Sequence, residues 1–327
     1  MKKYASIIVS DNLKIRPGEE VVIFADRKNL EYCDDLACCI RGSDAQVSTF
    51  YIPEIIRPVE KITDIHSNAL ISADAVIYIL ETKGEKLDLS KEVAFRHYLC
   101  SLPIQYKGRV CMMPGFSEEM KEAAMIDYSE LNRRSRNLKQ ILTDKNIRIM
   151  TDLGTDVRFS LYQREIKIDD GDLSKPGLFG NIPAGEIFTA PVEETMNGRL
   201  VIDGSIGGLG QVKMPFRIDI KAGIIQSMDP IGKKDDIFEK FSEICEYDSP
   251  ATKRVGEFGI GLNPGARIIG NMLMDEKVEG TVHFAFGDSY GLGKSSTKYH
   301  TDLLIRNPSI FVEDRCIMKN GKFIADI

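Results

Sequence analysis

The chain has 327 residues, of which 43% are hydrophobic and 28% are charged, with a formal net charge of -6. This is ordinary globular usage, so disordered, collagen-like and low-complexity classes are excluded. The excess of acidic residues does not indicate binding to nucleic acid or to an anionic membrane, which basic proteins favour. No stretch approaches the roughly 18 consecutive apolar residues of a membrane-spanning helix.

The cysteine pattern and the first residues indicate a cellular compartment. The seven cysteines form no C-x-x-C pair, and Cys33, Cys38 and Cys39 lie in an expected helix. Such usage is typical of reduced thiols rather than of a disulfide framework. Residues 1–11 contain two lysines, but their apolar run is too short for a signal peptide. We therefore expect a cytoplasmic protein.

The first 145 residues alternate between buried-strand and helical patterns. Strands are expected at 20–25, 46–52, 75–80 and 108–113, and helical patterns at 30–40, 67–73, 118–126 and 130–143. Strands separated by helices predict an α/β domain with a mainly parallel sheet. At roughly 100–200 residues per domain, the chain length predicts a second domain.

The pattern changes after residue 146 to short strands separated by Gly and Asp turns. Strands are expected at 146–150, 156–161, 165–168, 199–206, 215–220, 224–228, 281–286, 300–305 and 309–312, with helices at 235–247 and 268–273. This predicts an α+β domain with a largely antiparallel sheet. We divide the chain into an α/β domain, 1–145, and a metal-binding catalytic domain, 146–327.

Histidine is scarce, with four residues in the chain. His66 and His97 lie on helical segments and have sufficient structural explanations. His283 lies in an apolar strand, and His300 opens another strand in which Asp302 points to the same face, because side chains alternate along a strand. An H-x-D pair with a second histidine is a plausible set for Zn, Fe, Mn or Co. A structural hydrogen bond or salt bridge would also explain the pair.

Two glutamates stand out through their surroundings. Glu186 lies between a turn at 181–185 and an apolar strand at 187–191. Glu257 lies in the glycine-rich run 255–261, where a backbone can approach a ligand closely. Either side chain could instead be a solvated turn carboxylate.

The sequence does not meet the requirements of three common binding or catalytic motifs. Residues 287–295 resemble a phosphate-binding loop but have five residues instead of four between the glycines, and a strand is expected after them instead of a helix. The glycines at 207–210 and 259–261 do not open a helix within a βαβ unit, as dinucleotide binding requires. The sequence has no G-x-S-x-G nucleophile elbow.

A family resemblance starts at residues 181–191, N-I-P-A-G-E-I-F-T-A-P. This segment resembles the N-x-P-x-x-E-V-F-T-A-P signature of the thermophilic-type metallo-aminopeptidases, aminopeptidase T, aminopeptidase S and their relatives. The resemblance continues, in one order, through 256–264, 275–277, 280–287, Tyr290 and 300–302. It therefore covers mainly residues 146–327.

The resemblance implies an aminopeptidase, a hydrolase that removes N-terminal residues from peptides with a free N-terminus. It implies two divalent metal ions, Zn, Co or Mn, and a homodimer. From the acidic charge balance we expect no nucleic-acid or membrane partner. The implied metal ligands are Glu186, Glu257, Glu276, His283, His300 and Asp302. We expect one of the first two glutamates to take the proton from the attacking water, and Tyr290 to donate a hydrogen bond to the oxyanion.

A related branch implies a different reaction. The dihydroxypyridine ring-cleaving dioxygenases are similar in the C-terminal domain and hold a single Fe(II) with two His and one Asp. His283, His300 and Asp302 could form that triad without the glutamates. The presence of Glu186 and Glu257 in their signature contexts favours the two-metal hydrolase. A third possibility is a metal-binding relative without peptidase activity.

Overall fold

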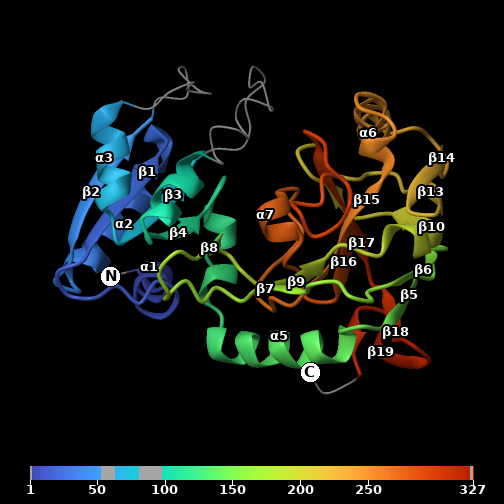
Figure 1. Cartoon of the computed structure of the whole chain (residues 1–327), viewed down its shortest axis with the longest axis horizontal. Helices are drawn as coiled ribbons and strands as arrows, with labels where there is room; N and C mark the ends of the chain where they lie inside the picture. The colour runs from blue at the N-terminus through green and yellow to red at the C-terminus, as the bar shows by residue number, and fades with distance from the viewer. Residues whose placement is uncertain (1, 53–62, 81–97, 325–326) are drawn as a thin grey trace. The chain divides into compact units, whose positions relative to one another are not determined.

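The computed structural model describes residues 2–52, 63–80, 98–324 and 327, which form two compact units (Figure 1). The first unit is Met1–Tyr128 with Gly171–Ala184, and the second is Ser129–Asp170 with Gly185–Ile327. The division into domains between residues 145 and 146 stays a prediction. His97 lies outside the described residues.

The first unit contains a parallel sheet with the order β2-β1-β3-β4-β8. Its strands are β1 Glu20–Ala25, β2 Gln46–Tyr51, β3 Ala75–Ile79, β4 Arg109–Met112 and β8 Phe179–Asn181. Its named helices are α1 Lys3–Ile7, α2 Leu30–Arg41 and α3 Asp64–Ser72. The apolar runs of β1 and β3 are buried because parallel strands are covered on both faces. The predicted α/β class of this part is confirmed.

A buried arginine connects the first strands of this unit to its N-terminal segment. The Arg109 guanidinium donates from Nη2 to Glu19 Oε2 at 2.5 Å and from Nη1 to the Leu13 carbonyl at 2.9 Å. Its Nε donates to the Asp74 carbonyl at 3.2 Å. The side chain is 3% exposed, so these partners replace the water that the charge loses.

The second unit contains two antiparallel sheets. One has the order β14-β13-β10-β6-β5-β18-β19-β20 and the other β12-β11-β17-β16-β15-β9-β7. The strands of the first are β5 Asn146–Met150, β6 Asp156–Ser160, β10 Asn197–Ile202, β13 Phe216–Lys221, β14 Ile224–Pro230, β18 Ser309–Val312, β19 Arg315–Lys319 and β20 Lys322–Phe323. The strands of the second are β7 Lys167–Asp169, β9 Glu186–Thr189, β11 Ser205–Ile206, β12 Gly210–Gln211, β15 Val255–Gly261, β16 Thr281–Gly287 and β17 His300–Arg306. The predicted antiparallel α+β class is confirmed.

Aromatic rings pack the two sheets of this unit against each other. The Phe159 ring of β6 lies 4.8 Å from Phe258 of β15 and 5.6 Å from Phe284 of β16, measured between ring centroids. All three side chains are buried. Since neighbouring residues along a strand point to opposite faces, the residues beside Phe258 and Phe284 face away from this core.

The described residues of the second unit also form the α-helices α5 Tyr128–Leu142, whose first residue lies at the unit boundary, α6 Asp236–Glu246 and α7 Met272–Asp275. The Asp235 carboxylate caps α6 by accepting from Ile237 N at 3.2 Å. The predicted helices over 130–143 and 235–247 are confirmed, whereas the structure shortens and shifts the one expected at 268–273.

Two local expectations differ from the structure. Residues 118–126 form two short turns, Glu118–Met120 and Ala123–Met125, because the chain is already extended at Ile126 before α5 begins. Residues 255–261 form a fully buried central strand, although their glycines lower strand propensity. Glycine is needed at Gly259 and Gly261 because the His283 ring and the backbone of Val278 pack directly against them.

Replacing Arg109 with Met should lower the stability of the first unit by about 2–4 kcal/mol, because the half-buried Glu19 carboxylate and two carbonyls lose their donor. Urea unfolding followed by circular dichroism measures the change. The control is Lys167→Met, which removes a partner of the exposed Glu165 and should barely move the midpoint. Equal midpoints for the two variants would contradict a structural role of Arg109.

Candidate metal centre

Most of the predicted site residues project from one face of the sheet that contains β9, β15, β16 and β17, whereas Glu276 follows α7 and Tyr290 lies in the loop after β16. In register, Glu257 pairs with Ala285, and Ala285 pairs with Asp302. Residues that are in register on neighbouring strands share a face. Glu257 and Asp302 therefore point to the same side of the sheet, separated by the small side chain of Ala285.

The two histidines belong to the same face. His283 lies two residues before Ala285 on β16 and pairs with Gly259 of β15. His300 lies two residues before Asp302 on β17 and pairs with Gly287. Each histidine is thus paired with a glycine on the neighbouring strand.

These glycines are required by close approach. A Cβ added at Gly259 would lie 2.2 Å from Cε1 and Nε2 of the His283 ring. A Cβ at Gly261 would lie 2.1 Å from the Val278 carbonyl oxygen. The glycines of β15 therefore leave room for a buried imidazole and for the chain segment after α7.

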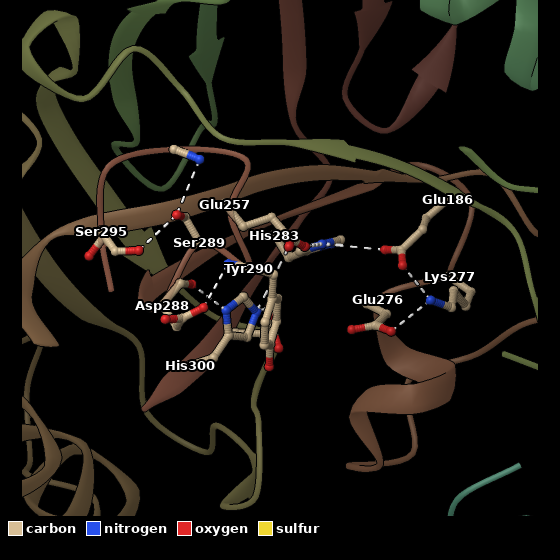
Figure 2. A network of polar contacts seen from close by, with 12 residues as sticks. Glu186, Glu257, Glu276, Lys277, His283, Asp288, Ser289, Tyr290, Ser295 and His300 are labelled. Carbon is tan, nitrogen blue, oxygen red and sulfur yellow. Dashed lines mark hydrogen bonds and ion pairs between the residues drawn. The ribbon is translucent and has the colours of Figure 1, made fainter. Parts of the chain in front are cut away.

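Figure 2 shows Glu257, His283 and His300 pointing toward one another, and Asp302 lies beside His300. His283 Nε2 lies 3.2 Å from Glu257 Oε1. His300 Nε2 lies 3.2 Å from Asp302 Oδ1 and 3.9 Å from Glu257 Oε2. One ligand atom each of Glu257, His283 and Asp302 can be chosen so that all lie within 4.8 Å of one another. Two imidazoles and two carboxylates at this spacing can hold a divalent metal ion.

A backbone contact fixes the ring of His300. Its Nδ1 lies 2.7 Å from the Asp288 carbonyl oxygen. Because a carbonyl only accepts hydrogen bonds, Nδ1 is the donor, and Nε2 is the nitrogen directed toward Asp302 and Glu257. Histidines that bind metals are commonly oriented in this way.

Buried polar atoms without a hydrogen bond support the same interpretation. Among the described residues, none forms a hydrogen bond with Asp302 Oδ1, although His300 Nε2 is within ion-pair distance. Buried acceptors are normally satisfied, so an exception calls for a partner such as an ion. The donor set and this oxygen both fit a metal ion.

Negative charge dominates the electrostatics of the site. Burial alone would lower the pKa of His283, but the Glu257 and Glu186 carboxylates outweigh burial and raise it to about 9. The pKa of His300 rises to about 10 in the same way, chiefly through Asp302. The His300 imidazolium in turn holds the pKa of Asp302 below its usual range, against the effect of burial. Without a metal ion, the carboxylates of the site therefore favour the protonated, positively charged forms of His283 and His300.

A second acidic cluster lies beside the first and contains a lysine. The Lys277 ammonium contacts Glu186 Oε1, Glu276 Oε1 at 2.7 Å and Asp169 Oδ2 at 3.2 Å. Burial alone would lower the pKa of Lys277, but the three carboxylates raise it well above its ordinary value. Burial also raises the pKa of Glu276 and that of Asp169. Glu186 links the clusters, since its Oε2 lies 3.4 Å from His283 Nε2 (Figure 2).

Tyr290 borders the site from the loop after β16. Its ring lies 4.5 Å from the His300 ring between centroids, and the residue is 64% exposed. Its backbone has φ 49°, and its N–H donates to Asp288 Oδ1 at 2.7 Å. Non-glycine residues in this conformation are uncommon and often found at functional sites.

The rest of this loop is closed by its own hydrogen bonds. The Ser289 hydroxyl donates to the Ser295 carbonyl at 2.8 Å, and Gly293 N donates to that hydroxyl at 3.1 Å. The buried Glu193 carboxylate accepts from Lys294 N at 2.5 Å. The loop continues into strand β17. These features differ from a phosphate-binding loop, which has free backbone N–H groups and opens a helix.

The structure brings the predicted site residues into one neighbourhood, but in two groups. Glu257, His283, His300, Asp302 and Tyr290 form the first, and Glu186 and Glu276 are joined to Lys277. Sequence reasoning did not single out Lys277 or Asp169. The signal for Lys277 was its place in the Asp275-Glu276-Lys277 segment of the resemblance, and that for Asp169 was its place at the end of a strand beside Glu186.

Comparison with known proteins identifies a family and a fold. The family model described as NicX, 2,5-dihydroxypyridine 5,6-dioxygenase, matches residues 9–325. A 2,5-dihydroxypyridine 5,6-dioxygenase of Pseudomonas putida KT2440 is 23% identical, over an alignment that covers 62% of this chain and 61% of that protein.

Two solved structures are similar in fold. The structure of 2,5-dihydroxypyridine dioxygenase from Pseudomonas putida KT2440 has a TM-score of 0.78 at 16% identity, covering 99% of this chain and 96% of its own. Wild-type AmpT from Thermus thermophilus has a TM-score of 0.70 at 17% identity, covering 99% of this chain and 98% of its own. In the part of the chain that the structure describes, no helix is long and apolar enough to cross a membrane.

These findings correct the predicted function. The resemblance to the aminopeptidases holds for the fold, but the predicted activity, an aminopeptidase and hydrolase, is wrong. The family model and the curated relative instead agree with the dioxygenase alternative. The error arose because the signature segments around Glu186 and Glu257 were interpreted as evidence for two metal ions.

Replacing Gly259 with Ala should displace the His283 ring and weaken metal binding on the order of tenfold or more. Overpacking should also cost about 1–3 kcal/mol of stability. The matched control is Gly207→Ala, whose Cβ would meet Asp302 N at 3.4 Å, an ordinary contact. Equilibrium dialysis with Mn(II) measures both variants. Unchanged affinity in Gly259→Ala would contradict the role of His283.

Proposed function

The chain belongs to the 2,5-dihydroxypyridine 5,6-dioxygenase family, and we propose that it opens the ring of a dihydroxypyridine with O₂ at a single ferrous ion. We propose His283, His300 and Asp302 as the ligands. Two histidines and one carboxylate with open positions are the usual donor set of non-haem Fe(II) oxygenases. In such a reaction both atoms of O₂ enter the product as one ring C–C bond breaks, so no external reductant is needed.

The observation that carries this proposal is the convergence of His300 and Asp302 on β17 with His283 on β16. His300 Nε2 is already directed inward by the bond between its Nδ1 and the Asp288 carbonyl. Asp302 Oδ1 is buried without a hydrogen bond from any described residue. Ferrous iron held there would supply the one-electron chemistry that lets O₂ react with a closed-shell aromatic ring.

The remaining residues of the first group would act on the substrate. Glu257 is a buried carboxylate within reach of both imidazoles, and we assign it the role of accepting a proton from a ring hydroxyl. Tyr290 presents an exposed ring beside His300. A flat heteroaromatic substrate could stack on that ring in an offset arrangement.

The enzyme loaded anaerobically with Fe(II) should consume about one O₂ per molecule of 2,5-dihydroxypyridine, with loss of the ring's ultraviolet absorbance. An oxygen electrode and a spectrophotometer measure the two quantities together. Asp302→Asn, which keeps the size of the side chain but not its charge, should lose Fe(II) and oxygen uptake together. Absence of uptake by the Fe(II)-loaded wild-type chain with this substrate would contradict the assigned substrate.

Replacing Glu257 with Gln should leave Fe(II) bound and lower kcat on the order of 100-fold or more, since a positioned base contributes about 10²–10⁴ in rate. Metal content and steady-state oxygen uptake separate the two effects. Loss of Fe(II) from this variant would show instead that Glu257 is a ligand, and full kcat would show that it is not the base.

A further inference from the structure

Lys277 is an unusual residue in the second acidic cluster. It is 0% exposed, and Asp169, Glu186 and Glu276 all lie around its ammonium. Lysine is almost never fully buried unless paired. Here one ammonium has three carboxylate neighbours, whereas a salt bridge needs only one.

Without the lysine, these side chains would resemble a divalent-metal site. One ligand atom each of Glu186, Glu276 and His283 lie within 4.8 Å of one another. Asp169 Oδ2 is buried with the Lys277 ammonium at 3.2 Å, so removing the lysine would leave this oxygen without that cation, and Glu186 Oε2 is buried with His283 Nε2 at 3.4 Å. Carboxylates with an imidazole are suitable ligands for Zn(II) and Mn(II).

We infer that the Lys277 ammonium occupies the second cation position of this centre, so that the chain binds one divalent ion where its ligands could hold two. The inference deepens the proposed function, on which it rests, because it states why a site so rich in carboxylates would stay mononuclear.

Backbone contacts hold the lysine in this place. Asn263 N donates to the Lys277 carbonyl at 2.8 Å, and Lys277 N donates to the Met274 carbonyl at 3.1 Å. Gly261 lets this segment lie against β15, since a Cβ there would be 2.8 Å from the Lys277 carbonyl carbon. With its backbone fixed at both groups, the side chain extends into the acidic cluster.

The position of the ammonium also determines which carboxylates remain available. Lys277 engages Glu186 Oε1 and Glu276 Oε1, the two carboxylates nearest to it. His283 belongs to both groups of possible ligands. With Glu186 and Glu276 bound to the ammonium, His283 is left to act with Asp302 and His300 on a single ion.

Counting bound metal tests this directly and without activity. Metal-stripped protein is titrated with Mn(II), and with Zn(II) in a second series, and bound equivalents are measured by equilibrium dialysis. The wild-type chain should bind one equivalent and Lys277→Met two. Lys277→Arg keeps the positive charge and should bind one. The control Lys121→Met removes another buried lysine, from the first compact unit, and should also bind one.

Each outcome decides a separate point. Two equivalents in the wild type would overturn both the inference and the single-iron proposal. One equivalent in a folded Lys277→Met would overturn the inference alone and leave the single-iron proposal intact. No metal in the wild type would overturn both. If Lys277→Met is unfolded without metal, thermal unfolding is repeated with Zn(II) for it and for Lys277→Gln. Folding restored by Zn(II) with two bound equivalents would support the inference, and no restoration would overturn it.

Discussion

The His283 ring can lie across its neighbouring strand only because the residue paired with it, Gly259, has no side chain. Close backbone approach recurs along the sheet, because Gly261 admits the segment that carries Lys277 and a Cβ at Gly287 would meet the Tyr299 carbonyl oxygen at 2.1 Å. An antiparallel sheet repeats its side chains every second residue on each face. Glycine and alanine therefore alternate with polar residues on one face of this sheet, which leaves room there for the imidazoles and carboxylates to approach one another. The opposite face of the sheet, with Phe258, packs against the other sheet of this unit.

Electrostatics then determines what this face of the sheet can bind. The carboxylates outnumber the fixed cations, and isolated buried charges are costly unless they are neutralised. In the metal-free chain the balance comes from protons on His283 and His300 and from the ammonium of Lys277. The protons can be replaced by a metal ion, whereas the lysine is part of the chain. A fold shared with an aminopeptidase T can in this way host a different reaction, since chemistry depends on the site and not on the fold.

Much of this arrangement follows from the sequence, and what does not has a physical reason. Apolar runs such as 75–80 and the H-x-D spacing of His300 and Asp302 are local signals, and they predicted strands and a shared face. The strand at 255–261 was not predicted because its glycines are chosen for close approach and not for strand propensity. The inward direction of Lys277 could not be predicted either, since most lysines are solvated. The reaction was wrongly predicted because the presence of Glu186 and Glu257 was interpreted as favouring two metal ions, whereas the family model and the relative match the dioxygenases.

The central claim is that one metal ion binds between His283, His300 and Asp302. The most direct measurement is a crystal structure of the chain loaded anaerobically with Fe(II), with an anomalous difference map recorded above the iron absorption edge. The account predicts a single peak among these three side chains, with Lys277 still between Glu186 and Glu276. A peak between those two glutamates, or a pair of peaks that share His283, would contradict it.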